Sequence, residues 1–292
     1  MPKNFRLKTP TIVRRWISRG LAVSLLAAGG AALAQGVQAQ VKLDAEYGVT
    51  LLGLPIGSGT WSAELSGDHY VMNATGKVAG IMKVFSSGEG AASVRGAISG
   101  AKLLPAGYAI NIKAGGKADQ VRMALASSTV KQLSVEPPPE PKPDRIPLTD
   151  ANKRGITDPI SSGIFSVGDK GLTPEVCQRT APIFDGRIRF DLALSFKKMA
   201  KVKTEKGYAG PAVVCAVKFN PIGGHEAHKS GIRFLRETRD IEIWYAPIEG
   251  THFVAMYKIM LPTQLGIAAI EATRFVVAPL SIRAGAAGAK TQ

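Results

Sequence analysis

The stretch Cys177–Phe196, which reads CQRTAPIFDGRIRFDLALSF, decides the fold class of this chain. Its apolar residues fall at every second position, at Ile188, Phe190, Leu192, Leu194 and Phe196. An alternation with period two is typical of a β-strand that has one buried face and one wet face. A second alternating run, Ala212–Phe219, contains Cys215. The sequence therefore predicts two successive strands, one preceded by a cysteine and one containing a cysteine.

Much of the remaining chain repeats this alternation. Short runs, separated by Gly, Pro, Asn or Asp at intervals of about ten residues, predict an antiparallel meander. The expected strands are Leu43–Leu54, Trp61–Leu65, a run from Tyr70, Ala92–Ser99, Ala106–Lys113, Asp119–Leu125, Arg187–Lys197, Ala212–Phe219, Arg239–Ala246, Thr251–Leu261 and Gly266–Val277, with a turn at Pro55–Gly59. We expect a mainly all-β protein with a strongly curved antiparallel sheet, β-spiral or barrel-like, and one or two short helices.

Two short helices and one connector interrupt the strand pattern. Val78–Ser86 has helical spacing, and a second helix is expected to begin at Thr157 or Asp158 as N-cap, with Pro159 in its first turn. Residues 136–147 read EPPPEPKPDRIP, a proline-rich sequence typical of an extended connector. Because either half alone would leave exposed sheet edges, we predict one β domain over residues 40–280 and a disordered tail over 281–292.

Residues 1–39 resemble a secretory signal peptide. Six basic residues and no acidic residue precede or flank an apolar run of 14 residues, Leu21–Ala34. The small-residue pattern before Gln40 predicts cleavage after Ala39, and hence a periplasmic protein. The alternative is an uncleaved amphipathic anchor.

The net charge falls once this segment is removed. The chain has 37 basic and 22 acidic residues, and without residues 1–39 it has 31 basic and 22 acidic residues, a net charge of +9. A moderately basic exported protein favours anionic lipid headgroups or cell-wall polymers, and export makes nucleic acid an unsuitable partner.

The two cysteines predict one disulfide bond, between Cys177 and Cys215. An even number of cysteines in an exported chain favours pairing in the oxidising periplasm. A closed loop of 38 residues contributes about 4 kcal/mol to stability in the chain-entropy model. The alternative is two unrelated buried thiols.

The sequence contains few groups suited to catalysis. His225-Glu226-Ala227-His228 is the nearest approach to a metal motif, but it lacks the HExxH spacing and a third ligand, so a solvated loop is the simpler interpretation. Asp185 and Asp191 are expected to pair with Arg187 and Arg189 rather than to act as an acid and a base. We predict no cofactor, metal or catalytic residue.

Two further groups of side chains have alternative interpretations. Lys197, Lys198, Lys201, Lys203 and Lys206 are expected at a hairpin tip, where they either meet anionic headgroups or protect a sheet edge from pairing. The aromatic residues on apolar positions either line a ligand cavity or fill a core. They are Trp61, Tyr70, Phe85, Tyr108, Phe190, Phe196, Phe219 and Tyr257.

The chain resembles domain of unknown function family 3108, which occurs in exported bacterial proteins. The resemblance rests on YGVTLLGLPIGSGTW, PAGYAINIKAGG, ITDPISSGIF and CQRTAPIFDGRIRFDL, and it extends over Ala45–Val277. It implies a curved antiparallel sheet in the periplasm and, more distantly, the half-barrel of lipoprotein and lipid carriers, in which a sheet wraps a short helix and leaves an apolar cavity. It implies no catalytic residues.

Two functional hypotheses follow. In the first, the protein is a non-enzymatic periplasmic protein that supports the cell envelope, either by binding an apolar ligand such as a lipid or lipoprotein or by docking an envelope partner, with peripheral membrane contact. In the second, it is a metal-dependent envelope hydrolase that uses His225 and His228. The scarcity of converging titratable groups favours the first.

Overall fold

The structure is a computed structural model that describes residues 40–80 and 88–280, most of which form antiparallel strands. The strands before the connector are β1 (Val41–Leu51), β2 (Leu54–Ser66), β3 (His69–Val78), β4 (Gly88–Ser99), β5 (Lys102–Ala114), β6 (Lys117–Ala126) and β7 (Thr129–Glu136). Those after it are β8 (Ile164–Ser166), β9 (Arg179–Phe184), β10 (Arg189–Lys203), β11 (Lys206–Gly207), β12 (Ala209–Gly223), β13 (Ile241–Pro247), β14 (Phe253–Thr263) and β15 (Gly266–Pro279).

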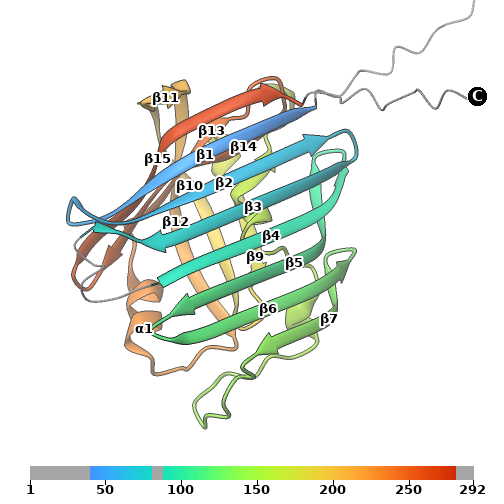
Figure 1. Ribbon diagram of the computed structural model, residues 1–292, viewed down its shortest axis with the longest axis vertical. Helices are drawn as coiled ribbons and strands as arrows, with labels where there is room; N and C mark the ends of the chain where they lie inside the picture. The colour runs from blue at the N-terminus through green and yellow to red at the C-terminus, as the bar shows by residue number, and fades with distance from the viewer. Residues whose placement is uncertain (1–39, 81–87, 281–292) are drawn as a thin grey trace, which may run out of the picture. The chain divides into compact units, whose positions relative to one another are not determined.

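Strands from both sides of the connector belong to one sheet (Figure 1). Its order is β7-β6-β5-β4-β3-β2-β1-β15-β14-β13-β12-β10-β9, and the short strands β11 and β8 pair with β15 and β14. The join between the halves is the long antiparallel pairing of β1 with β15, from Val41 opposite Pro279 to Leu51 opposite Ala268. The predicted all-β, barrel-like fold is therefore confirmed.

The core lies on one face of this sheet. Inward positions alternate with outward ones along each strand, as Leu43, Ala45 and Tyr47 do in β1. The chain between β7 and β9 contributes η2 (Ala151–Lys153), η3 (Ser161–Gly163), η4 (Gly168–Lys170) and η5 (Pro174–Cys177). Part of this segment packs against the inner face, because Gly163 contacts the Trp61 ring and Cys177 is bonded to β12.

The two edge strands do not pair directly with each other. Instead, the segment between η2 and η3 bridges to both of them, through Arg154 beside Thr129 at the start of β7 and Thr157 beside Ile183 of β9. The Ile156 N–H donates to the Ser128 carbonyl at 2.9 Å, the Thr157 N–H donates to the Pro182 carbonyl at 2.8 Å, and the Phe184 N–H donates to the Thr157 carbonyl at 3.0 Å. Since unpaired edges promote aggregation, this segment protects part of β7 and β9.

The turn predicted at Pro55–Gly59 is wrong, because those residues lie inside β2. The β1–β2 hairpin turns at Leu52-Gly53 instead, and both residues have positive φ, at 53° and 80°. Two successive positive φ angles define the two-residue hairpin turn that matches the twist of the strands. The glycines after Pro55, Gly57 and Gly59, lie on the inner face of β2.

Several other predictions also need correction. Strands β7 and β9 and the single regular α-helix of the described residues, α1 (Ser230–Glu237), were not predicted. The helix expected over Val78–Ser86 falls mostly on residues 81–87, outside the described residues, and Val78 itself ends β3. The helix expected from Thr157 or Asp158 is only the single turn η3, whose N-cap residue is Ile160; the Asp158 carboxylate accepts hydrogen bonds from the Ile160 and Ser161 N–H groups. Among the described residues, no helix is long and apolar enough to span a membrane.

Candidate functional site

The inner face of β2, β3 and β4 carries glycine instead of large side chains toward the end of the sheet where β1 turns into β2. Gly59, Gly76 and Gly90 are directly paired in one row across these strands, and Gly57 and Gly88 lie on the same face nearer the turn. A Cβ built on Gly76 meets no atom within 4 Å. At Gly76 the bare backbone therefore forms a wall with open space in front of it, whereas a Cβ on Gly59 would lie 2.7 Å from the Thr75 carbonyl oxygen.

An apolar cavity of about 420 Å³ lies against this wall. Its other walls come from residues 154–178 between β7 and β9, here called the interior segment, and from β1, β9, β10, β13, β14 and β15. Val49, Ile270, Ile259 and Ile243 form one paired row across four strands of its lining. A second space of about 400 Å³ adjoins it, and Ala74, Gly76 and Ile160 line both.

The lining of the larger cavity is uncharged as far as the structure describes it. It contains no Asp, Glu, Lys, Arg or His side chain, and its aromatic members are Tyr47, Trp61, Phe190 and Tyr245. Burial raises the pKa of the Tyr47 and Tyr245 hydroxyls, so both remain neutral. The Tyr47 hydroxyl donates to the Met256 carbonyl at 2.7 Å. This environment favours an uncharged, apolar ligand.

One polar atom in this wall lacks a partner. Trp61 is only 5% exposed, and its buried Nε1 has no hydrogen-bond acceptor among the described residues. A buried donor left unpaired costs about 1–3 kcal/mol.

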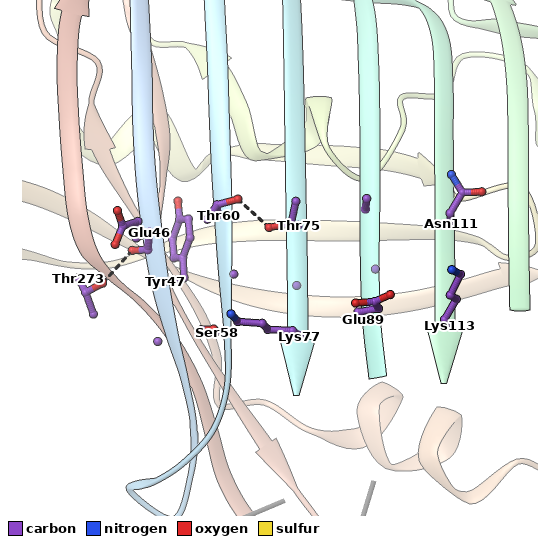
Figure 2. Close-up of a pocket in the computed structure, with 15 residues that line it drawn as sticks. Glu46, Tyr47, Ser58, Thr60, Thr75, Lys77, Glu89, Asn111, Lys113 and Thr273 are labelled. Atoms are coloured by element: carbon purple, nitrogen blue, oxygen red, sulfur yellow. Dashed lines mark hydrogen bonds between the residues drawn. The ribbon is translucent and has the colours of Figure 1, made fainter. Parts of the chain in front are cut away.

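The opposite face of the same strands carries a polar groove of about 850 Å³ (Figure 2). Thr60 and Thr75 share a hydrogen bond of 2.7 Å across β2 and β3. Glu89 faces Lys77 on one side and Lys113 on the other in the strand register. Opposite charges that alternate across strands are typical of a solvated sheet face, so we do not treat this groove as the binding site.

The predicted disulfide bond between Cys177 and Cys215 is present, with a Cα–Cα distance of 5.4 Å and both residues fully buried. It does not join two strands, because Cys177 lies in η5 and Cys215 in β12. The bond therefore attaches the interior segment to the inner face of the sheet.

The His225–His228 loop holds the connector. The Glu226 carboxylate lies 3.1 Å from Lys142 Nζ and 3.7 Å from Arg145 Nη2, and the Ile146 N–H donates to the His225 carbonyl. His225 is buried, whereas His228 is exposed. Within the described residues, no group of three or more His, Cys, Asp or Glu is placed to hold a metal ion.

The two aspartates of the DGRIRFD motif act structurally. Asp191 pairs with Arg189 at 2.6 Å, as expected. Asp185 accepts hydrogen bonds from the backbone N–H groups of Arg187 and Ile188, and the Arg187 side chain pairs instead with Asp119 of β6 at 2.6 Å. This motif therefore ties the start of β10 to the opposite half of the sheet.

The lysine cluster is not confined to a hairpin tip. Lys197, Lys198 and Lys201 lie within β10, and only Lys203 and Lys206 flank the turn. Lys197 pairs with Glu242 at 2.5 Å, and the ammonium group of Lys198 lies 5.5 Å from the Trp244 ring centroid. These contacts indicate a solvated strand face.

The predicted aromatic face divides between core and cavity. Tyr70, Tyr108 and Tyr257 are buried in the core. Trp61 and Phe190 line the cavity, Phe219 packs against the second core cluster, and Phe85 lies outside the described residues. Phe196 is 40% exposed, and a bulge between Phe196 and Lys198 interrupts the alternation after it.

The fold and the cavity define a class: a curved, barrel-like antiparallel sheet with an apolar interior. A family model described as Protein of unknown function (DUF3108) matches residues 44–273, so the chain belongs to that family. A solved structure described as a β-barrel-like protein of domain of unknown function DUF1849 from Brucella abortus is similar, with 10% identity and a TM-score of 0.48. The match covers 82% of this chain and 99% of that chain. No curated protein matches the sequence.

Proposed function

We propose that this protein binds an apolar ligand, such as the acyl chain of a lipid or lipoprotein, inside the curved sheet, and that it serves the cell envelope without catalysing a reaction. The observation that carries this proposal is the glycine wall in front of an uncharged cavity of about 420 Å³. Ligand sites commonly occupy about 300–1,000 Å³ and combine an apolar lining with a few polar groups. Trp61 and three other aromatic residues, Tyr47, Phe190 and Tyr245, contribute to this apolar lining.

The proposed location is the periplasm. The disulfide bond between Cys177 and Cys215 is typical of an oxidising compartment. The charge and hydrophobicity pattern of residues 1–39 supports export through a signal peptide. No observation in the described residues favours the metal-dependent hydrolase over this proposal.

Filling the cavity from its glycine wall tests the proposal. Gly76→Leu places a side chain in open space without a clash at Cβ, and we expect it to weaken binding of a fatty acid by roughly tenfold or more. Asn73→Leu adds the same side chain to an exposed outward position of β3 and should leave binding unchanged. Thermal midpoints of both variants close to that of the wild type would show that the fold is intact.

The fluorescence of Trp61 reports where the ligand lies. In a background with Trp16→Phe and Trp244→Phe, Trp61 is the only tryptophan of the chain. A brominated fatty acid in the cavity should quench it, and Gly76→Leu should prevent the quenching. The proposal fails if Gly76→Leu binds as well as the wild type, or if native mass spectrometry and quenching both detect no ligand.

A further inference from the structure

Two neighbouring hairpin tips expose large aliphatic side chains. They are the β1–β2 turn and the β14–β15 turn, each with a two-residue loop. The exposed residues are Leu52 (66%), Leu54 (54%), Leu265 (74%) and Ile267 (50%). Such exposure on adjacent tips is unusual, because soluble proteins scatter their exposed aliphatic residues singly.

The two tips lie side by side at one end of the sheet (Figure 1). The Leu52 N–H donates to the Ile267 carbonyl at 2.9 Å, and the Leu52 side chain covers Gly266. No charged residue occurs in the sequence between Glu46 and Glu64 or between Lys258 and Glu271. Both tips and the strand ends that support them are therefore entirely uncharged.

Leu52 occupies a backbone position that does not suit it. Its φ of 53° lies in the left-handed region, where Asn and Gly are preferred and a branched apolar residue is strained. A strained and solvent-exposed leucine contributes little to the stability of the fold. Strain that folding does not require is found mostly at functional sites.

Basic residues surround the same end of the sheet. Lys77, Lys113 and Lys117 lie at the ends of β3, β5 and β6 that face the tips. Helix α1 connects β12 to β13 at this end and adds the exposed Arg233 and Arg236. The exposed Arg239 adds to these, and the acidic residues at this end, Glu89, Glu237 and Asp240, leave an excess of positive charge. Positive charge around projecting apolar side chains suits an anionic bilayer surface.

We propose that the β1–β2 and β14–β15 tips form a membrane-contact site that inserts its aliphatic side chains into the headgroup region of an anionic lipid bilayer. A bilayer fits these tips better than a protein partner does, because narrow hairpin tips offer no broad complementary face. The inference is independent of the proposed cavity ligand, since it depends on other residues.

A double variant, Leu52→Asn with Leu265→Ser, tests the site without disturbing the fold. The first change creates the Asn-Gly pair that this turn prefers, so the hairpin should be at least as stable as in the wild type. We expect co-flotation with phosphatidylethanolamine–phosphatidylglycerol vesicles to fall by roughly tenfold or more. All proteins are prepared identically, so any contribution of residues 1–39 is common to them.

The matched control replaces exposed apolar residues elsewhere. Val71→Ser with Met199→Ser changes side chains that are 39% and 43% exposed and lie in β3 and β10, away from the tips, and vesicle binding should persist. Gly76→Leu should also retain vesicle binding, which separates this test from that of the cavity.

Three outcomes contradict the membrane-contact site: no vesicle binding by the wild type, equal binding by the tip variant, or tips that mediate self-association in light scattering while vesicles remain unbound. Binding that increases with phosphatidylglycerol content and falls with salt would indicate that the basic residues at this end of the sheet contribute to vesicle binding. Replacing Lys77, Lys113 and Lys117 by Gln should reduce that preference for anionic lipid.

Discussion

Asp158 carries a fully buried carboxyl group within the interior segment of the protein. Its Oδ1 accepts hydrogen bonds from the N–H groups of Ile160 and Ser161, both at 2.9 Å, whereas Oδ2 has no partner among the described residues. Burial raises the pKa of this carboxyl group above its ordinary value. Ser161 also hydrogen-bonds to Tyr70 at 2.8 Å, so Asp158 supports a buried polar network.

This raised pKa predicts a pH-dependent stability. The folded protein holds the Asp158 proton more tightly than the unfolded chain, whose carboxyl pKa is about 3.9. Its stabilising contribution is therefore complete below that pH and is lost as the pH rises through the folded pKa. Asp158→Asn keeps the acceptor oxygen and removes the titration, so its stability relative to the wild type should increase from about pH 4 to pH 8.

Urea unfolding at several pH values measures this difference. Asp185 also has a pKa raised by burial, but it is present in both proteins and its effect largely cancels. A stability difference that does not change with pH would mean that Asp158 titrates normally.

At the scale of elements, the disulfide bond holds the interior segment in place. Because η5 is bonded to β12, we expect replacement of Cys177 and Cys215 by Ala to lower the free energy of unfolding by about 4 kcal/mol, less any native strain. Urea unfolding measures the loss, and hydrogen exchange should increase over residues 154–178. A loss below about 1 kcal/mol, at the low end of what disulfides contribute, would show that the core alone fixes this segment.

The sequence predicted most strands after the connector but placed several elements wrongly. Alternation of apolar residues in the sequence identified β10, β12 and β14, each of which contributes buried residues to the core. It missed β7, an edge strand that is exposed over most of its length, and α1, which buries no residue. Elements that bury little apolar surface leave little pattern in the sequence.

The cavity was only partly predictable. The sequence suggested that aromatic residues either line a cavity or fill a core, and the structure shows both. Glycines 57 and 59 were read as a turn because glycine permits a turn and a bare strand wall equally well. What distinguishes the two is the pairing of Gly59 with Gly76 and Gly90, residues far apart in the chain. The two hairpin tips likewise meet only through the pairing of β1 with β15.

At the scale of the whole molecule, the pairing of β1 with β15 joins the two halves of the chain into one sheet. Trp61 in β2 and Trp244 in β13 lie on opposite sides of the connector. Each remains as a sole reporter when the other and Trp16 are replaced by Phe. If the sheet unfolds cooperatively, as we predict, both variants will show wild-type far-UV transitions and their own fluorescence will change at the same urea concentration.

Different fluorescence midpoints, with each variant retaining its wild-type stability by far-UV circular dichroism, would indicate two independently unfolding units and contradict a single domain. The connector, which is exposed over Pro137–Pro143, gives each half enough freedom for such behaviour if the sheet pairing were weak.

The pairing of the first and last strands also places the two ends of the described sheet together, since the Leu280 N–H donates to the Gln40 carbonyl at 2.8 Å. The ends of the described sheet are thus neighbours in space, and the exposed connector lies near the middle of the chain. A chain rearranged to begin after that connector, with its old ends linked by a few residues, retains the same strand neighbours. We therefore expect the same sheet to form whichever half of the chain is synthesised first.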